Sequence, residues 1–309
     1  MTLHDWRDRP AAQVAPLYAA ERARWQRDLS WDTAATWAVV EEARTAGRLP
    51  GYLVEERGRI TGWTFFLLHD DTLQIGALAA DEARGVRHLL ERVMAAPEGQ
   101  QARTVSLFLL PGSPALGAAL TRRRFTQRVH HYLSLDLAGA AGAATTGAAV
   151  RPWRGGDETA AVRLMADAYR GQPSAVCYAP HGRLDEWAWY VRQLLRTPSC
   201  GLLRPDLTFV AAGTAGAPAG VVLTTAIDRR TAHIAQVAVA PGTQGRGVGR
   251  ALVTAAIARA RELGYERLTL MVAEDNARAR HLYDTLGFTP GPAFLYAARP
   301  LPSRLARAS

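Results

Sequence analysis

Residues 234–249 place an apolar strand, a glycine-rich turn and the start of an amphipathic helix directly after one another. Gly245, Gly247 and Gly249 carry no Cβ, so an anion can approach the main chain closely at these positions. The first N–H groups of a helix and the positive end of its dipole attract phosphate groups. Arg246 and Arg250 add positive charge to the same turn. This arrangement predicts a binding site for a diphosphate.

The spacing of the glycines distinguishes this turn from two other phosphate-binding motifs. A P-loop requires a lysine before Ser or Thr, and the sequence contains no lysine. A dinucleotide-binding fingerprint requires a glycine at the sixth position, where windows that begin at Gly245 and Gly247 have Arg250 and Leu252. The remaining pattern, Gln-Gly-Arg-Gly-Val-Gly at 244–249, resembles motif A of the GNAT superfamily of acyl-CoA-dependent N-acyltransferases.

A second segment, residues 273–288, also resembles this family: an Asn is followed by Leu-Tyr and then by Leu-Gly-Phe. The resemblance implies that Asn276 hydrogen-bonds the cofactor, although the same residue is equally suited to cap a helix. It also implies that Tyr283 gives a proton to the departing thiolate of coenzyme A. The alternative for Tyr283 is an aromatic side chain that packs on the sheet.

The strand before the turn is the other part of the site that the resemblance implies. The main-chain N–H of Val237 would stabilise the developing oxyanion, and Val239 would pair with the pantetheine arm. Several relatives carry a glutamate base four residues before the oxyanion donor, which here is His233. Histidine titrates near neutrality and is therefore our candidate base. Asp228, Glu274 or water alone are the alternatives.

Taken together, the resemblance implies transfer of an acetyl group from acetyl-CoA to a primary amine of a small molecule or peptide, without an acyl-enzyme. The alternative is a coenzyme A-binding module without turnover. The segment between the first two helices of the second half would bind the acceptor through Tyr178, His181 and Trp189. The expected cofactor-binding residues are Val237, Ala238, Val239, Gln244, Gly245, Arg246, Gly247, Val248, Gly249, Arg250, Asn276 and Tyr283.

Two halves with the same order of elements position these residues. Apolar residues at intervals of four, from Val248 to Ala260, predict a helix that packs on a sheet. We expect an α/β protein with two GNAT-like domains, each a mixed, mainly antiparallel sheet flanked by helices. They would span 1–137 and 150–309, joined by an Ala/Gly linker at 138–149.

The first half differs from the second where the chemistry would occur. An alignment of Gly85 with Gly247 places Glu82 at the position of Gln244 and Arg87 at that of Gly249. A carboxylate would repel a phosphate there, and an arginine side chain would obstruct its approach. We therefore expect a non-catalytic first half, with a weak coenzyme A site as the alternative.

Composition excludes several other classes of protein. The net charge is +9, but all 37 basic residues are arginines without an aromatic-interleaved basic patch, which argues against a nucleic-acid-binding protein. No run approaches the roughly 18 apolar residues of a membrane span, and the first residues do not form a signal peptide. Cys177 and Cys200 are too few for a metal site. We expect a cytoplasmic monomer or homodimer.

Overall fold

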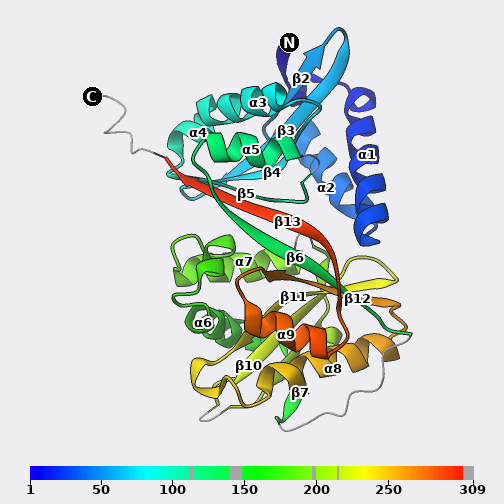
Figure 1. Cartoon of the computed structure of the whole chain (residues 1–309), viewed down its shortest axis with the longest axis vertical. Helices are drawn as coiled ribbons and strands as arrows, with labels where there is room; N and C mark the ends of the chain where they lie inside the picture. Colours follow the sequence, from blue (N-terminus) through cyan, green and yellow to red (C-terminus); the bar gives the residue numbers. More distant parts are fainter. Residues whose placement is uncertain (112–113, 139–147, 197–199, 214–215, 302–309) are drawn as a thin grey trace. The chain divides into compact units, whose positions relative to one another are not determined.

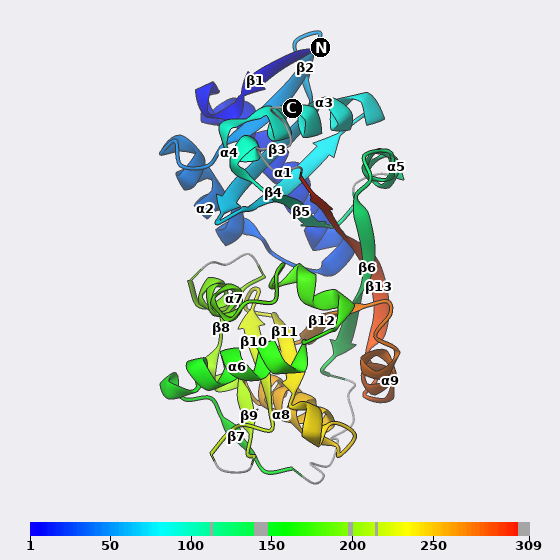
Figure 2. The ribbon, with the colours of Figure 1, turned by 90° about the vertical axis from the view of Figure 1, so that its left-hand side faces the viewer.

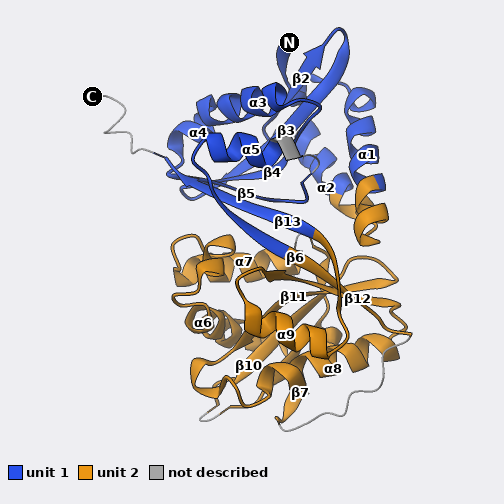
Figure 3. Ribbon diagram, in the orientation of Figure 1, with its two compact units in different colours: residues 1–23, 37–130, 293–309 blue, residues 24–36, 131–292 orange. Residues whose placement is uncertain are grey.

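The computed structural model describes residues 1–111, 114–138, 148–196, 200–213 and 216–301. These residues form two compact units (Figure 3). Unit 1 contains residues 1–23, 37–130 and the chain from 293 onward, and unit 2 contains residues 24–36 and 131–292. None of the helices in the described ranges has both the length and the apolar character of a membrane span.

The two units differ from the expected domain boundaries because the chain passes between them more than once. Residues 24–36 and 131–137 belong to unit 2, and the last strand from residue 293 belongs to unit 1. Strand β13 (Thr289–Pro300) explains the second difference, since its residues Leu295–Pro300 pair antiparallel with β5 (Thr104–Leu109) of unit 1. Residues 139–147 of the expected linker lie outside the described residues.

The sheet of unit 2 is mixed. Its strands are β7 (Val150–Pro152), β8 (Leu202–Leu203), β9 (Phe209–Ala211), β10 (Gly220–Ala226), β11 (Thr231–Val239), β12 (Arg267–Ala273) and the second part of β6 (Thr126–Asp136). The order is β7-β9-β10-β11-β12-β6, with β8 beside β10. The pair β11–β12 is parallel, whereas β10 is antiparallel to β8, β9 and β11.

Helices cover both faces of this sheet, as the views in Figures 1 and 2 show. On one face, α6 (Glu158–Ala168) and α7 (Leu184–Arg196) bury Met165, Trp187 and Val191 against strand residues such as Leu223. On the other, α8 (Val248–Glu262) and α9 (Ala277–Thr285) cover the sheet. The predicted apolar stripe of α8, Val248, Leu252, Ala256 and Ala260, is buried there. The short 3-10 helices η2 (Gly155–Asp157), η3 (Pro173–Cys177), η4 (Pro205–Leu207) and η5 (Pro241–Thr243) lie in the connections.

Unit 1 repeats this plan. Its strands are β1 (Thr2–Asp5), β2 (Gly51–Glu56), β3 (Arg59–His69), β4 (Thr72–Ala80), β5, the end of β13 and the first part of β6, in that spatial order. Its helices are η1 (Trp6–Asp8), most of α1 (Ala11–Leu29), most of α2 (Ala34–Thr45), α3 (Ala83–Ala95), α4 (Pro97–Gln101) and α5 (Pro114–Arg122). Again one central pair, β4–β5, is parallel. Both units therefore confirm the expected α/β class with mixed, mainly antiparallel sheets.

Candidate active site

A bulge separates β11 from its neighbour where the sequence predicts the thioester site. Leu223 and Thr224 of β10 pair with Gln236 and Ile234, so Ala235 is an additional residue without a partner. On the other side, the parallel pairing with β12 ends at Ile234 and Leu270, although both strands continue. A bulge bends a strand and increases its twist. The result is an unpaired edge along the last residues of β11.

The direction of the main-chain groups shows which of them face this edge. The N–H of Ala240 donates to the carbonyl oxygen of Ala219 at 2.9 Å, on the β10 side. Because successive N–H groups of a strand alternate in direction, Ala238 also faces β10. Val237 and Val239 therefore direct their N–H groups toward the gap beside β12. These are the two residues that the resemblance assigned to the thioester and pantetheine.

The glycine-rich turn between η5 (Pro241–Thr243) and α8 is open to a ligand. Gly245 and Gly247 have φ angles of +83° and +80°, which an L side chain rarely adopts. A Cβ at Gly247 would meet no atom within 4 Å, so the space over it is accessible. Gly247 is the N-cap of α8, and because glycine has no side chain, it leaves the N–H groups of the first turn of the helix uncapped. The N–H groups beginning at Val248 can therefore donate to an anion.

Arginines surround this turn. Arg246 is exposed, and Arg250 donates from Nη2 to the Thr285 hydroxyl at 2.6 Å. Arg278 of α9, which the sequence analysis did not single out, donates from Nη1 to Oε1 of Gln244 at 3.3 Å. Its Nη2 lies 3.5 Å from the position of a Cβ on Gly245. Open main-chain donors and guanidinium groups together fit the diphosphate of coenzyme A.

Gln244 and Asn276 both make contacts within the protein. Nε2 of Gln244 donates to the carbonyl oxygen of Val239 at 3.3 Å, which holds the turn against the end of β11. Oδ1 of Asn276 accepts from the N–H of Ala279 at 3.1 Å and caps α9. The capping role is thus observed for Asn276, and its contact with a cofactor stays a prediction.

Tyr283 lies on α9, is 6% exposed and packs edge-on against Phe288. Burial raises the pKa of its phenol well above the ordinary value, so the hydroxyl keeps its proton. Burial raises the pKa values of Tyr169 and Tyr178, and the nearby phenol of Tyr283 adds a smaller increase. Tyr283 is therefore both a core residue and a neighbour of the tyrosines on the α6–α7 side.

These tyrosines form a cluster with Gln236. The hydroxyl of Tyr169 donates to Oε1 of Gln236 at 2.6 Å, and the hydroxyl of Tyr190 contacts the carbonyl oxygen of Ala235 at 3.4 Å. Tyr178, a predicted acceptor residue, lies between Tyr169 and Tyr190: its ring is edge-on to that of Tyr169 and tilted against that of Tyr190, with ring centroids 5.7 and 5.2 Å away. We did not predict Tyr169 or Gln236. The signal available in the sequence was Gln236 itself, a single glutamine in an otherwise apolar stretch of strand.

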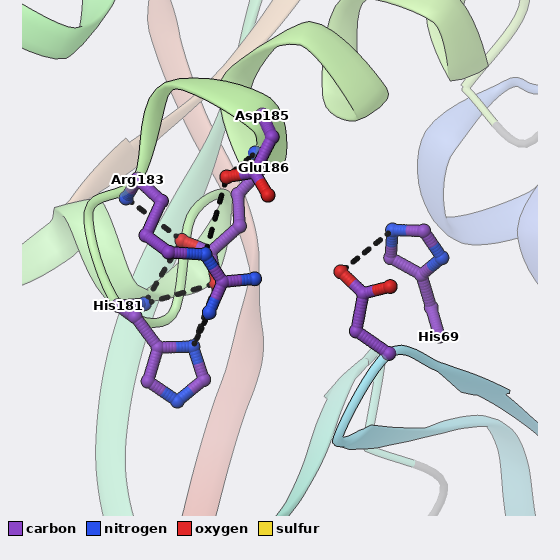
Figure 4. Close-up of polar contacts among 6 residues, drawn as sticks. His69, His181, Arg183, Asp185 and Glu186 are labelled. Carbon is purple, nitrogen blue, oxygen red and sulfur yellow. Dashed lines mark hydrogen bonds and ion pairs between the residues drawn. The ribbon is translucent and has the colours of Figure 1, made fainter.

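His181 and Trp189, the other predicted acceptor residues, lie elsewhere in this segment. Nδ1 of His181 is 2.7 Å from Oε1 of the buried Glu186, and the N–H groups of His181 and Arg183 donate to the same carboxylate (Figure 4). Glu186 thereby organises the turn before α7. Trp189 is half-buried on α7. Of the three, Tyr178 is a member of the tyrosine cluster.

His233 does not occupy the position that we expected for a base. In a regular strand, residues 233 and 237 would share a face, but the extra residue Ala235 reverses the alternation between them. Ile234 and Val237 both pack on the α8 side of the sheet. Because neighbouring side chains of a strand point to opposite faces, His233, which precedes Ile234, faces the other side. His233 is 4% exposed, its Nδ1 contacts the hydroxyl of Thr269 at 2.9 Å, and burial lowers its pKa to about 3. A histidine with this pKa is a poor base at neutral pH.

The two alternative bases have structural partners as well. Oδ1 of Asp228 accepts from the N–H groups of Arg230 and Thr231 at 2.7 Å, which stabilises the turn between β10 and β11. Glu274 is 60% exposed and lies 3.4 Å from Nε2 of His131. Neither contact places a carboxylate at the unpaired edge of β11.

Unit 1 has the bulge but lacks the glycine-rich turn. Gly76 is the extra residue of β4, and pairing with β5 ends at Ile75. Strand β4 ends at Ala80, and α3 begins at Ala83 with Glu82 as its N-cap. Gly85 lies within α3 rather than in a turn, so our alignment of Gly85 with Gly247 was wrong. A Cβ on Gly76 would lie 2.1 Å from the Phe65 ring, because aromatic side chains fill this face.

Comparison with known proteins agrees with this geometry. The profile of the acetyltransferase (GNAT) family matches residues 163–288. A mycothiol acetyltransferase of Geodermatophilus obscurus is 31% identical over 257 residues, which cover 79% of this chain and 76% of the relative. That of Beutenbergia cavernae is 29% identical over 275 residues, covering 82% of this chain and 86% of the relative.

A solved tandem GNAT protein from the clavulanic acid biosynthesis pathway has a TM-score of 0.55 with 17% identity, covering 82% of this chain and 84% of that protein. It shares the fold of the two units. The profile match contains the bulged strand, the glycine-rich turn and Tyr283. The chain therefore belongs to the GNAT family, as a tandem-domain N-acetyltransferase that resembles the mycothiol acetyltransferases.

Proposed function

We propose that this protein transfers an acetyl group from acetyl-CoA to a primary amine of a small molecule or peptide, by direct attack and without an acyl-enzyme. The observation that carries the proposal is the unpaired edge of β11, which leads directly into the open glycine-rich turn. An extended ligand arm and a terminal diphosphate would be bound by consecutive residues of one segment. The similarity to mycothiol acetyltransferases makes their reaction one candidate for this chain.

The main chain and three arginines would hold the cofactor. The N–H groups from Gly245 to Gly249 would bind the diphosphate, with Arg246, Arg250 and Arg278 balancing its charge. The N–H of Val239 would pair with an amide of the pantetheine arm, and that of Val237 would stabilise the oxyanion. When bound, acetyl-CoA supplies an acetyl group activated as a thioester.

Tyr283 would act as the proton donor. As the new C–N bond forms and the C–S bond breaks, its hydroxyl would give a proton to the departing sulfur. A phenol that burial keeps protonated at every physiological pH is suited to this task. We leave His233, Asp228 and Glu274 out of the reaction, so the amine would lose its proton to water, and water would return a proton to the Tyr283 phenolate.

Free thiol measured with acetyl-CoA and a panel of amines tests the proposal. Thiol should appear above the rate of hydrolysis with at least one amine, and calorimetry should detect coenzyme A binding. Binding without thiol release would instead show a coenzyme A-binding module without turnover. Absence of binding would exclude both functions.

A further inference from the structure

Gln236 is a polar side chain at a position where the sheet is otherwise apolar. It follows the bulge residue Ala235 on β11 and is 3% exposed. It pairs with Leu223, whose side chain lies in the core beneath α6 and α7. The amide of Gln236 therefore points to this face, toward Tyr169.

Only part of this amide is satisfied within the protein. Oε1 accepts the Tyr169 hydroxyl at 2.6 Å, which fixes the orientation of the amide. Nε2 is buried and has no hydrogen-bond partner of normal geometry among the described residues, although the Tyr190 hydroxyl lies near enough to the amide for Gln236 to lower the pKa of Tyr190. A buried donor without a partner destabilises the folded protein, and such groups are uncommon in native structures. A ligand atom that accepts this hydrogen bond would account for it.

The surroundings of Gln236 are polar but uncharged. Burial raises the pKa values of Tyr169, Tyr178 and Tyr190, so all three hydroxyls are neutral. The groups that further shift these pKa values are other tyrosines, Cys177, Cys200 and Gln236 itself. A carboxylate or a second ammonium group on a ligand would gain no ion pair from them. A charged ligand group would also lose its hydration here, whereas a neutral oxygen would gain a hydrogen bond at a much smaller desolvation cost.

The location of Gln236 connects it to the proposed reaction. The next residue, Val237, directs its N–H to the gap beside β12, where the thioester would lie. The Tyr283 phenol, the proposed proton donor, lies near Tyr169 and Tyr178. An amine that reaches the thioester from the α6–α7 side would therefore pass the amide of Gln236.

We propose that Gln236 binds the acceptor substrate by donating a hydrogen bond from Nε2 to a neutral carbonyl or hydroxyl oxygen close to the reacting amine. Tyr169 is a positioning residue, because it holds the amide with Nε2 toward the ligand. The acceptor class is thus an amine with a neighbouring uncharged oxygen, such as an amino amide or an amino alcohol. This inference rests on the proposed function and specifies its substrate.

Steady-state kinetics with alaninamide, alanine and isopropylamine test the inference in the wild type and Gln236→Leu. Because the amines differ in basicity, the readout is the change in their kcat/KM ratio between the two proteins at one pH. Gln236→Leu should lower kcat/KM for alaninamide about tenfold or more relative to isopropylamine. It should leave the KM for acetyl-CoA within twofold. Tyr169→Phe should produce a smaller change in the same ratio.

The double variant Tyr169→Phe/Gln236→Leu serves as the control for folding. It removes both partners of the hydrogen bond and the unpaired donor, so its melting temperature should equal or exceed that of the wild type. Alanine should be a poorer substrate than alaninamide for the wild type. A structural role for Gln236 would lower stability and leave the substrate ratio unchanged.

Calorimetry distinguishes failure of this inference from failure of the proposed function. Coenzyme A-loaded wild type should bind alaninamide more tightly than Gln236→Leu does, even if no thiol is released. An unchanged alaninamide/isopropylamine ratio, or equal binding by both proteins, would overturn the inference. A raised KM for acetyl-CoA with an unchanged amine ratio would also overturn it, because Gln236 would then contact the acetyl donor.

Discussion

The indole ring of Trp31 stands edge-on against the imidazole ring of His233, with 4.9 Å between the ring centroids. Trp31 is itself 1% exposed and comes from the segment between α1 and α2, which belongs to unit 2. The contact removes His233 from water, and this burial lowers its pKa to about 3. A histidine in this environment affects stability rather than proton transfer.

The stability of the protein should depend on pH through His233. Between pH 6.5 and about 3, the unfolded chain binds the proton and the folded chain does not, so stability falls as the pH falls. Within this window the contribution is about 1.4 kcal/mol per pH unit. Urea denaturation of the wild type and His233→Gln at several pH values measures it. The slope of the variant should be smaller by this contribution, because the carboxylates that also titrate in this range are unchanged. The exposed His281→Gln should keep the wild-type slope.

Tyr283→Phe should lower kcat about 100-fold, because the departing thiolate loses its proton donor. Coenzyme A should still bind with wild-type affinity by calorimetry. Tyr265→Phe is the matched control, since Tyr265 is buried in unit 2 and its hydroxyl accepts from Arg204. Wild-type turnover by Tyr283→Phe would remove the proton-donor role.

Gly247→Ala tests the diphosphate site. Alanine at this position would have to adopt the left-handed conformation of Gly247, which costs about 1 kcal/mol. Its Cβ would also project into the space where the anion is expected. We expect at least a tenfold loss of coenzyme A affinity. Gly264→Ala is the control: its φ is +78°, it also has no atom within 4 Å of the added Cβ, and it lies after the end of α8. Both variants should be destabilised alike, and Gly264→Ala should bind coenzyme A normally.

Arg278→Gln should weaken coenzyme A binding several-fold, because a guanidinium beside the glycine-rich turn is lost. The difference from the wild type should shrink as the salt concentration rises. Arg280→Gln on the same helix is the control, since Arg280 contacts the carbonyl oxygen of Glu274 instead. Equal affinity of both variants at low salt would contradict the assignment of Arg278.

Each chain should bind one molecule of coenzyme A. Unit 1 connects β4 to α3 through Asp81 and Glu82 alone, without the glycine-rich turn. Isothermal titration should therefore give a stoichiometry of one, and Gly247→Ala should weaken the only binding event. A second binding event that survives in Gly247→Ala would place a site in unit 1.

The sequence predicted well those features that are encoded locally. The glycine-rich turn, the buried stripe of α8 and the N-cap Asn276 depend on neighbouring residues, and all three are found in the structure. The duplicated order of elements likewise predicted the two mixed sheets. Short elements such as β1 and α4 lacked a periodic pattern and were not predicted.

Features that depend on the register between strands could not be predicted in this way. The extra residue Ala235 is identified only when β10 is paired with β11, and it changes the face of His233. Gln236 and Tyr169 are distant in sequence, so their contact depends on how α6 packs on the sheet. The end of β13 belongs to the sheet of unit 1 because it pairs with β5, and no local pattern in the sequence encodes this pairing.

That strand has a consequence for biosynthesis. The residues Leu295–Pro300 that complete the sheet of unit 1 beside β5 are synthesised only after the rest of the unit 1 strands and the strands of unit 2. Until then the edge of β5 is uncovered and can pair with other chains. Nascent unit 1 is therefore expected to need a chaperone until β13 has been synthesised, and unit 1 expressed without β13 should aggregate.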